Sequence, residues 1–214
     1  MKEIDINTWQ RKNKYEWFKS NSNSTYGVNV KIDVTRLVEY TKIKKESFFV
    51  HMMYIVTKAL SSVDEMRMRL VNGVPVIFDS INPSFTVMTN LGVYDNTKIE
   101  YTEDLDEFYR RTLEALEQTK NQKDLVSKIY NEENRFDEYY ITCTPWLNFE
   151  SMSHPIPDDI GSQTIPRICW GKYTNNNEKY ELTLNITVSH IFVDGYPLSR
   201  VFNEVQEMIN NIKI

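Results

Sequence analysis

The residues best suited to chemistry lie in the stretch SHIFVDGYPL at 189–198, where His190 precedes an Asp-Gly pair by four positions. A neutral imidazole is the side chain best matched to accept a proton near pH 7. A histidine on an apolar face is, however, often only a satisfied core residue. His190 falls at the end of an alternating segment, where a loop begins, and catalytic residues concentrate at such places. Its position therefore favours a general base.

Asp194 can play three different roles in this stretch. It can orient His190 as in a catalytic triad, it can form the turn or cap the following helix, or it can pair with an arginine from elsewhere in the chain. A spacing of four residues permits contact with His190 without requiring it. We favour the turn and the ion pair over the triad.

The remaining histidines and the cysteines give little support to other chemistry. His51 lies within an apolar helical segment, where a structural role is expected, and His154 lies in a proline-rich loop, which is compatible with a surface position. The histidine spacing does not match a metal motif, so no metal site is expected. Cys143 and Cys169 show no CxxC spacing, and no disulfide framework is implied.

The elements that position His190 are the clearest in the chain. YELTLNITVSH at 180–190 alternates apolar and polar residues, which is typical of a strand with one buried face. His190 is in phase with the apolar set. After Gly195, apolar residues recur at helical spacing, and Pro197 suits the first turn of a helix. The Asp-Gly pair therefore joins a strand to a helix, and a plain hairpin is disfavoured.

Other segments predict a mixture of helices and strands. We expect a buried helix over 47–63 and an amphipathic surface helix over 104–118. Strands are expected at 74–79, 84–88, 139–143 and 165–173, a turn at 174–179, and loops from 119 to about 135. Strands and helices without strict alternation favour an α+β or mixed-sheet α/β fold.

Composition limits the classes of function. The 214 residues carry a net charge of −5, with 41% hydrophobic and 26% charged residues. No basic excess is present to neutralise phosphates, so nucleic acid is not an expected partner. No stretch approaches the roughly 20 apolar residues that span a membrane, and the first residues lack the apolar part of a signal peptide. We expect one domain over residues 1–214 and a cytoplasmic, reducing setting.

Five blocks of the sequence resemble the chloramphenicol acetyltransferase family. HIFVDGYPL is similar to the family's HxxxDG signature, and ICWGKY to its strand ending in Gly-Lys-Tyr. The other three blocks, in chain order, are TWQRKNKYEWF, VDEMRMRLVNGVPVIFDSINPSFTV and TCTPWLNFESM. HxxxDG alone is shared by a wider group of CoA-dependent acyltransferases. All five in the family's order, spanning residues 9–212, make the resemblance specific.

The resemblance implies a fold, an assembly and a reaction. The expected fold is a two-layer α/β sandwich with a large mixed sheet, and the expected assembly is a homotrimer with active sites between subunits. The implied reaction moves an acetyl group from acetyl-CoA to the 3-hydroxyl of chloramphenicol. The transfer is direct, with no covalent acyl-enzyme, and gives the two cysteines no role.

The resemblance also assigns roles to individual residues. His190 matches the general base, and Thr142 takes the place of a serine whose hydroxyl stabilises the tetrahedral oxyanion. Asp194 and Arg11 match an ion pair that holds the site together. The family's ligand contacts fall on Phe18, Tyr26 and Tyr94 for the acceptor, with Tyr94 matched across a gap, and on Lys172 and Tyr173 for the CoA nucleotide.

Several positions depart from the family's pattern, which makes acetyl transfer a firmer expectation than the acceptor. Ser189 stands in place of a first histidine, Pro197 in place of another histidine, Cys169 in place of a threonine and Phe18 in place of a frequent tyrosine. Another small hydroxyl compound is the alternative acceptor, and a catalytically silent CoA-binding protein is the alternative function. We expect a buried Arg11–Asp194 pair, so that Arg11→Ala would cost about 3–5 kcal/mol of stability.

Overall fold

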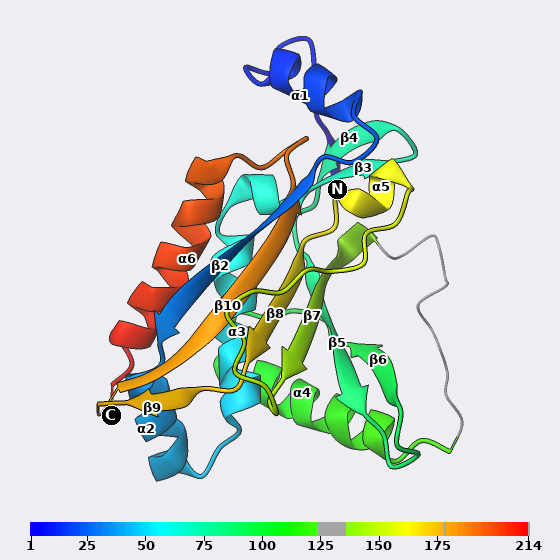
Figure 1. Ribbon diagram of the computed structural model, residues 1–214. Coiled ribbons are helices and arrows are strands. Elements are labelled where there is room, and N and C mark those ends of the chain that lie inside the picture. Colours follow the sequence, from blue (N-terminus) through cyan, green and yellow to red (C-terminus); the bar gives the residue numbers. More distant parts are fainter. Residues whose placement is uncertain (124–135, 178, 214) are drawn as a thin grey trace.

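The computed structural model describes residues 1–123, 136–177 and 179–213. The chain forms two sheets and a set of helices (Figure 1). In chain order the elements are β1 (Lys2–Glu3), α1 (Lys12–Lys19), β2 (Thr25–Asp33), α2 (Thr35–Lys44), α3 (Phe48–Ser61), a 3-10 helix (Asp64–Arg67), β3 (Met68–Val71), β4 (Val74–Ile77), β5 (Asn82–Met88), β6 (Tyr94–Lys98), α4 (Leu105–Lys120), β7 (Glu138–Thr144), α5 (Ile160–Gln163), β8 (Arg167–Gly171), β9 (Thr174–Asn176), β10 (Lys179–Ser189) and α6 (Gly195–Asn210).

The larger sheet has seven strands and is mixed. Its order is β2-β10-β8-β7-β5-β6, with β9 pairing β10 beyond the end of β8. The strands β8, β7 and β5 are parallel to one another, and the other neighbours are antiparallel. The smaller sheet, β1-β4-β3, lies at the upper end of the molecule in Figure 1, below α1. A large mixed sheet with helices confirms the expected α/β class.

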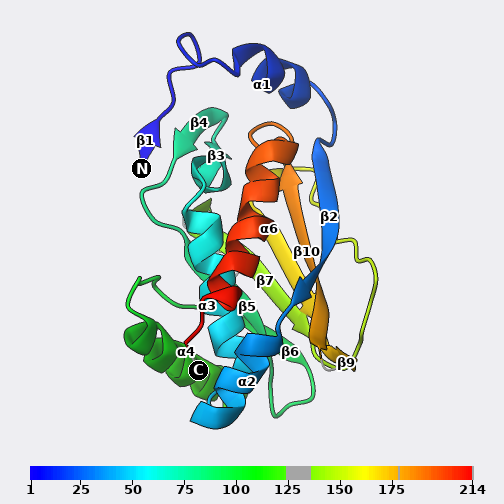
Figure 2. The same ribbon diagram turned by 90° about the vertical axis from the view of Figure 1, so that its left-hand side faces the viewer.

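The two faces of the larger sheet differ in chemistry. Helices α2, α3, α4 and α6 cover one face (Figure 2), and the side chains that point toward them form the apolar core. We call the opposite face, which carries mostly polar side chains on β7 and β10, the polar face. The segment over residues 145–159 crosses this face, in front of the strands in Figure 1. In β10 the apolar set Leu182, Leu184, Ile186 and Val188 lies in the core, as the alternation in its sequence predicts.

Local sequence explains where the main helices begin. Ser47 accepts a hydrogen bond from the backbone amide of Val50 at the start of α3, and Asp104 caps α4 through the amide of Glu107. A side-chain oxygen at this position satisfies an amide that the helix leaves without a partner. Most of α3 is buried, as expected. Helix α4 ends two residues after the predicted end. It buries only part of its surface, in agreement with its predicted amphipathic character.

The structure refines two expectations about loops. The predicted turn at 174–179 has its turn residue at Asn177, and the residues before it form β9, which pairs with the start of β10. His154 is half-buried and its Nε2 lies 3.1 Å from Asn185 Oδ1, so it is not a free surface residue.

His51 of α3 is buried and its Nε2 contacts Glu46 Oε2 at 2.6 Å, in agreement with the structural role expected for it. Most of the loop expected over 119–135 lies outside the described residues.

Candidate active site

His190 lies directly after β10, in the turn that leads to α6. Its backbone amide donates a hydrogen bond to the carbonyl of Ser24 at 2.8 Å, which ties the turn to the residues just before β2. Its side chain is one-third exposed. His190 therefore lies at the end of the sheet, directly after the last residue of β10, where its imidazole is accessible to solvent.

Two aromatic rings hold the imidazole. Phe18 stacks on His190 with ring centroids 4.1 Å apart and an angle of 7° between the planes. Tyr26 packs at 4.8 Å in a tilted arrangement and donates a hydrogen bond to the carbonyl of Val193. Burial, reinforced by the charge of Asp194, raises the pKa of Tyr26 to about 12, so its hydroxyl keeps its proton near neutrality.

Arg11 and Asp194 form a bidentate ion pair, although 183 residues separate them in the chain. Both terminal nitrogens of the guanidinium contact the carboxylate, the Nη2–Oδ1 distance being 3.1 Å. This fork geometry fixes both partners more strongly than a single contact would. The expectation of a buried pair is wrong in degree, because the Asp194 side chain is 40% exposed in this chain. Solvent screening lowers the expected contribution to stability below 3–5 kcal/mol.

The three roles considered for Asp194 can now be compared. Asp194 occupies the N-cap position of α6, but its side chain makes no capping hydrogen bond. Its Oδ1 lies 3.1 Å from His190 Nδ1, yet the direction of approach does not suit a hydrogen bond. The carboxylate is thus committed to Arg11 and sits beside the imidazole. Because Nδ1 faces Asp194, Nε2 is the nitrogen left for proton transfer.

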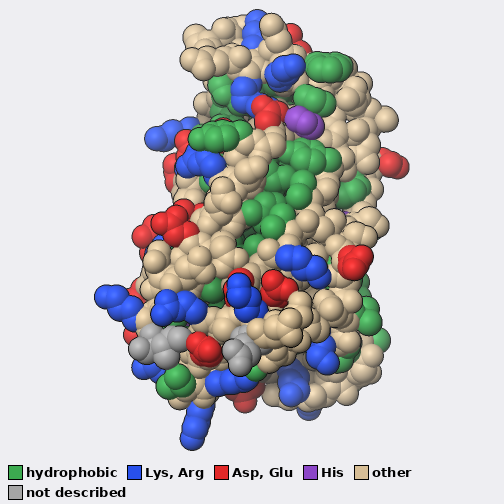
Figure 3. Space-filling view, turned by 60° about the vertical axis from the view of Figure 1, so that its left-hand side comes forward, with side chains coloured by type: hydrophobic (Ala, Val, Ile, Leu, Met, Phe, Trp, Pro, Cys, Tyr) green, Lys and Arg blue, Asp and Glu red, His purple; other side chains and the backbone are tan. Residues whose placement is uncertain are grey.

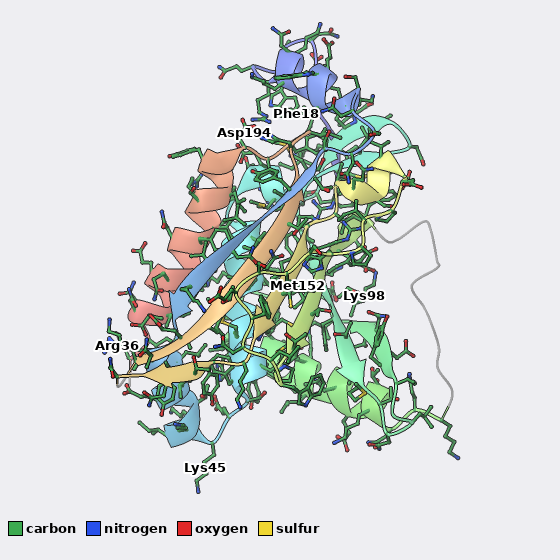
Figure 4. The ribbon with its side chains drawn as sticks, in the orientation of Figure 1. Phe18, Arg36, Lys45, Lys98, Met152 and Asp194 are labelled. Carbon is green, nitrogen blue, oxygen red and sulfur yellow. The ribbon has the colours of Figure 1, made fainter. Side chains whose placement is uncertain are left out.

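The segment around α1 carries Arg11 and Phe18 to His190. Trp9, Tyr15 and Phe192 pack against one another with centroid distances of 6.0–6.1 Å, which anchors α1 on the turn after β10. Ser24 contacts the carbonyl of Phe18 through its hydroxyl and fixes the end of this segment. Figure 4 shows Phe18 and Asp194 together at the upper end of the sheet.

The surface around this site combines charge and apolar area. In Figure 3 a histidine side chain reaches the surface beside an acidic and a basic side chain, above a band of hydrophobic side chains. Phe18 and Tyr26, which contact His190, are half-buried, and Val28, two residues after Tyr26 in β2, is 36% exposed. We call His190, Phe18, Tyr26, Arg11 and Asp194 the histidine cluster.

Thr142 lies in the second half of β7 and points to the polar face of the larger sheet. Its hydroxyl is half-buried and lies 3.2 Å from the hydroxyl of Thr86 on the neighbouring strand β5. On its other side, β8 places Cys169 opposite Thr142. We call Thr142, Thr86 and Cys169 the threonine cluster.

The chain after Thr142 returns across the polar face. The carbonyl of Leu147 accepts a hydrogen bond from the backbone amide of Lys172 at 2.7 Å. A side chain at Gly171 would meet that carbonyl at 2.6 Å, so only glycine fits beneath the crossing segment. Met152 lies over the middle of the sheet (Figure 4), where its carbonyl accepts from Asn185 at 3.2 Å.

The other predicted ligand contacts lie near the threonine cluster or beyond it. Lys172 is exposed and Tyr173 is half-buried against Phe48, both directly after β8 and near the end of β7. Tyr94 is 63% exposed and pairs with Met88 at the edge of the sheet. The structure thus places the predicted acceptor residue Tyr94 apart from Phe18 and Tyr26 within one chain.

His190 and Thr142 do not meet within one chain. The register aligns Thr142 with Cys169 and Cys169 with Asn185, which is five residues before His190. Five residues along a strand and two strand spacings put the two Cα atoms roughly 19 Å apart. The side chains also leave opposite faces, since His190 contacts Tyr26 opposite Val188 on the helix-covered face. A single carbonyl cannot contact both.

Comparisons with known proteins identify the family. The family model described as chloramphenicol acetyltransferase matches residues 1–206. A chloramphenicol acetyltransferase of Clostridium perfringens is 30% identical over 97% of this chain and 94% of its own length. Chloramphenicol acetyltransferase 3 of Escherichia coli is 26% identical over 97% and 96%. The chain belongs to the chloramphenicol acetyltransferase family.

Solved structures agree with this family at the level of the fold. A chloramphenicol acetyltransferase with 23% identity superposes with a TM-score of 0.90 over 98% of this chain and all of its own. A dihydrolipoamide acetyltransferase of Azotobacter vinelandii, 13% identical, gives 0.68 over 93% of this chain and 86% of its own. As a chloramphenicol acetyltransferase family member, the protein is an acyltransferase, and the resemblance seen in the sequence is confirmed.

The thiols of this family member are poorly suited to nucleophilic catalysis. Burial raises the pKa of the Cys143 thiol to about 12 and that of Cys169 to about 11, so neither forms a thiolate readily near neutrality. Within the described residues, no cluster of three or more His, Cys, Asp or Glu side chains could hold a metal ion. No helix in the same part of the chain is long and apolar enough to cross a membrane.

Sequence reasoning missed the residues that support the two clusters. Ser24, Trp9 and Tyr15 hold the histidine cluster through contacts made only by the folded chain. Thr86 was missed as well, because a single threonine in a strand gives no local signal of a role. The whole strand β2 was also missed, although its Val28, Val30 and Ile32 alternate with polar residues or glycine.

Proposed function

We propose that the protein is an acetyl-CoA-dependent O-acetyltransferase that acetylates the 3-hydroxyl of chloramphenicol, with His190 as general base. The observation that carries this proposal is the constrained and accessible imidazole. The orientation of the imidazole is fixed by stacking on Phe18, by contact with Tyr26 and by the carboxylate of Asp194, which lies 3.1 Å from Nδ1. The His190 side chain is nevertheless one-third exposed. A base held in this way is ready to take a proton from a bound hydroxyl.

The proposed chemistry is direct transfer. His190 Nε2 removes the proton of the acceptor hydroxyl as its oxygen forms a bond to the thioester carbonyl carbon. Thr142 donates a hydrogen bond to the oxygen that becomes negative in the tetrahedral intermediate. The carbon–sulfur bond then breaks, and the imidazolium returns its proton to the CoA sulfur. The raised thiol pKa values of Cys143 and Cys169 support a path without an acyl-enzyme.

We further propose that the active site is completed by a second copy in a homotrimer. The separation of roughly 19 Å between His190 and Thr142 within one chain supports a site in which one subunit supplies the base and another the oxyanion donor. Trp146 and Leu147, just after β7, are 69% and 62% exposed. An apolar surface of this kind beside Thr142 suits a contact between subunits.

The proposed assembly also suggests where the substrates bind. We propose that Lys172 and Tyr173 contact the CoA nucleotide, since an exposed ammonium and a half-buried ring lie near the Thr142 end of the sheet. Phe18 and Tyr26 would line the acceptor side near the base. Tyr94 would join them from the other subunit, which accounts for its distance from them in one chain.

A second acceptor is favoured by one observation. Phe18 lies flat on His190 where family members often carry tyrosine, so the acceptor side lacks that hydroxyl. Another small hydroxyl compound is therefore the alternative acceptor. A silent CoA-binding protein is less compatible with the Arg11–Asp194 pair beside an accessible base.

The first experiment measures thiol release from acetyl-CoA with and without chloramphenicol, using the wild-type protein and His190→Ala. Chloramphenicol-dependent release that the variant lacks, with 3-O-acetylchloramphenicol as product, supports reaction and base together. Release only with other alcohols would move the assignment to the alternative acceptor. Binding of CoA without release with any hydroxyl compound would indicate the silent homologue.

A second experiment tests the shared site by co-expressing His190→Ala with Thr142→Val. In random trimers, about a quarter of the interfaces would combine an intact His190 from one chain with an intact Thr142 from the other. Each variant alone would be nearly inactive, so recovered activity in the mixture supports the composite site. No recovery in demonstrated mixed trimers would contradict it.

The domain organisation and the setting of the protein are also proposed. We propose that residues 1–214 form a single domain, because one hydrophobic cluster takes side chains from both sheets, including Leu70 of β3 and Leu184 of β10. The cytoplasmic setting, the independence from metals and the absence of nucleic acid or membrane partners stay predictions.

A further inference from the structure

We propose that Thr86 is a positioning residue that aims the hydroxyl of Thr142 at the oxyanion. This inference rests on the proposed function, in which Thr142 stabilises the tetrahedral intermediate. It goes beyond that function by assigning the direction of the Thr142 hydroxyl to a side chain on another strand.

The geometry follows from the pairing of β5 with β7. These strands are parallel, and their register aligns Phe85 with Ile141, so that Thr86 and Thr142 come next and share the polar face. Their hydroxyl oxygens are 3.2 Å apart, and both residues are half-buried. Neighbouring strands in one sheet keep their register rigidly, and a threonine side chain has few χ1 choices. The two hydroxyls are thus held in contact by the fold.

The direction of the hydrogen bond between them decides whether Thr142 can act. Each hydroxyl has one hydrogen and two lone pairs. If Thr142 donates to Thr86, it has no hydrogen left for the oxyanion. If Thr86 donates to Thr142, the Thr142 hydrogen is free, and the accepted bond polarises it and strengthens its donation. Catalysis therefore requires Thr86 as the donor of the pair.

On the other side of Thr142, the neighbouring residue on β8 does not offer an equivalent hydroxyl. Cys169 lies across from Thr142 on β8, at a position where the family's pattern has a threonine. Its thiol is fully buried and is a weak donor, and it lies 3.8 Å from the carbonyl of Trp170. Of the two residues beside Thr142 on the neighbouring strands, Thr86 on β5 is therefore the stronger hydrogen-bond donor. This makes Thr86 the side chain that fixes the direction of the Thr142 hydroxyl.

The test is a double-mutant cycle on the assembled enzyme. Kinetics are measured for Thr86→Val, Thr142→Val and the double variant, with acetyl-CoA and chloramphenicol as substrates. We expect Thr142→Val to lower kcat by about 10²–10³ and Thr86→Val by roughly tenfold, with KM nearly unchanged. In the Thr142→Val background, Thr86→Val should cause no further loss. Thr86→Ser, which keeps the hydroxyl, should restore most of kcat.

A matched control separates positioning from strand stability. Thr97 is also a half-buried threonine of the larger sheet, but it pairs with Phe85 and points to the other face. Thr97→Val should leave kcat at the wild-type value. If Thr86→Val does not fold, Thr86→Cys supplies the same comparison, because it keeps a side chain of similar size with a weak donor.

The outcomes distinguish this inference from the function on which it rests. An equal loss of kcat from Thr86→Val with and without the Thr142 hydroxyl would overturn the positioning role and leave the oxyanion role intact. An unchanged kcat in Thr142→Val would overturn the oxyanion role itself, and the positioning role with it. A loss in Thr86→Val that serine rescues, present only when Thr142 is intact, supports the proposal.

Discussion

The histidine cluster and the threonine cluster are built by different forces. The histidine cluster gathers Arg11, Phe18 and Asp194 from distant parts of the chain around one imidazole, by ring stacking and a bidentate ion pair. The threonine cluster is formed by adjacent strands of one sheet, and its contact is a neutral hydrogen bond between Thr86 and Thr142. One cluster depends on tertiary packing and charge, and the other on strand register.

This difference matches the proposed division of labour. A base must accept and return a proton, so its ring needs a fixed orientation and an accessible nitrogen. An oxyanion donor must be in place before charge develops, and rigid strands provide that preorganisation. Mutations at the two clusters should therefore fail in different ways. Changes around His190 should affect stability and rate together, whereas changes around Thr142 should affect rate alone.

The largest effect is expected from His190→Ala. Removing the base should lower kcat by at least about 10²–10⁴, while acetyl-CoA still binds, because the proposed contacts to the CoA nucleotide are made by Lys172 and Tyr173 and not by the imidazole. The measurements are steady-state kinetics and calorimetric titration with acetyl-CoA. Near-wild-type turnover in the folded variant would remove His190 from the mechanism.

Arg11→Ala should give the next largest effect and should change rate and stability together. Asp194 would lose its partner and could no longer hold a fixed position beside His190, so kcat should fall by roughly tenfold. Because Asp194 is 40% exposed, the loss of unfolding free energy should be only about 1 kcal/mol. Urea denaturation and kinetics measure the two quantities.

Arg36→Ala is the control for this variant, since Arg36 donates to the carbonyl of Asn210 on the surface, far from Asp194 (Figure 4). It should leave kcat unchanged. A loss near 3–5 kcal/mol in Arg11→Ala would indicate that the assembled trimer buries Asp194. Wild-type stability and rate would show that the ion pair does not support the site.

Phe18 allows a smaller change within the histidine cluster. Phe18→Ala removes the ring stacked on His190 at 4.1 Å, an interaction worth about 1 kcal/mol. We expect kcat/KM for the acceptor to fall by roughly fivefold, from looser orientation of the imidazole. Phe18→Tyr keeps the ring and should retain the rate, with any gain for chloramphenicol reporting the restored hydroxyl. Equal rates for alanine and phenylalanine would contradict a role for stacking.

More of the fold than of the site could be predicted from the sequence. The alternation of β10 and the helical stripe of α6 are local patterns, so the position of His190 between them could be predicted. The partner of Asp194 could not be derived from spacing, because Arg11 is 183 residues away and only the family resemblance pointed to it. The exposure of Asp194 depends on tertiary packing, which periodicity does not report.

The threonine cluster shows the same limit for a different reason. Thr142 was assigned through the resemblance, and Thr86 was not assigned at all. Their contact depends on β5 and β7 being neighbours, although α4 and a long connection separate them in the chain. Nothing local distinguishes Thr86 from Thr97, which has a similar degree of exposure on the adjacent strand. Register, and not composition, decides which threonine meets Thr142.

The smallest expected effect lies on the polar face, at His154. Burial, together with the charge of Arg167, lowers the pKa of His154 below its usual 6.5, while the hydrogen bond to Asn185 opposes the shift. The unfolded chain then binds more protons than the folded chain below about pH 6.5, so stability should fall as the pH decreases from there. His154→Gln keeps an N–H donor for Asn185 and removes the titration. Urea midpoints at about pH 7.5 and about pH 5.5 should differ less in this variant than in the wild type. An unchanged pH dependence would place the titrating group elsewhere, and the segment over 145–159 would then be held independently of His154.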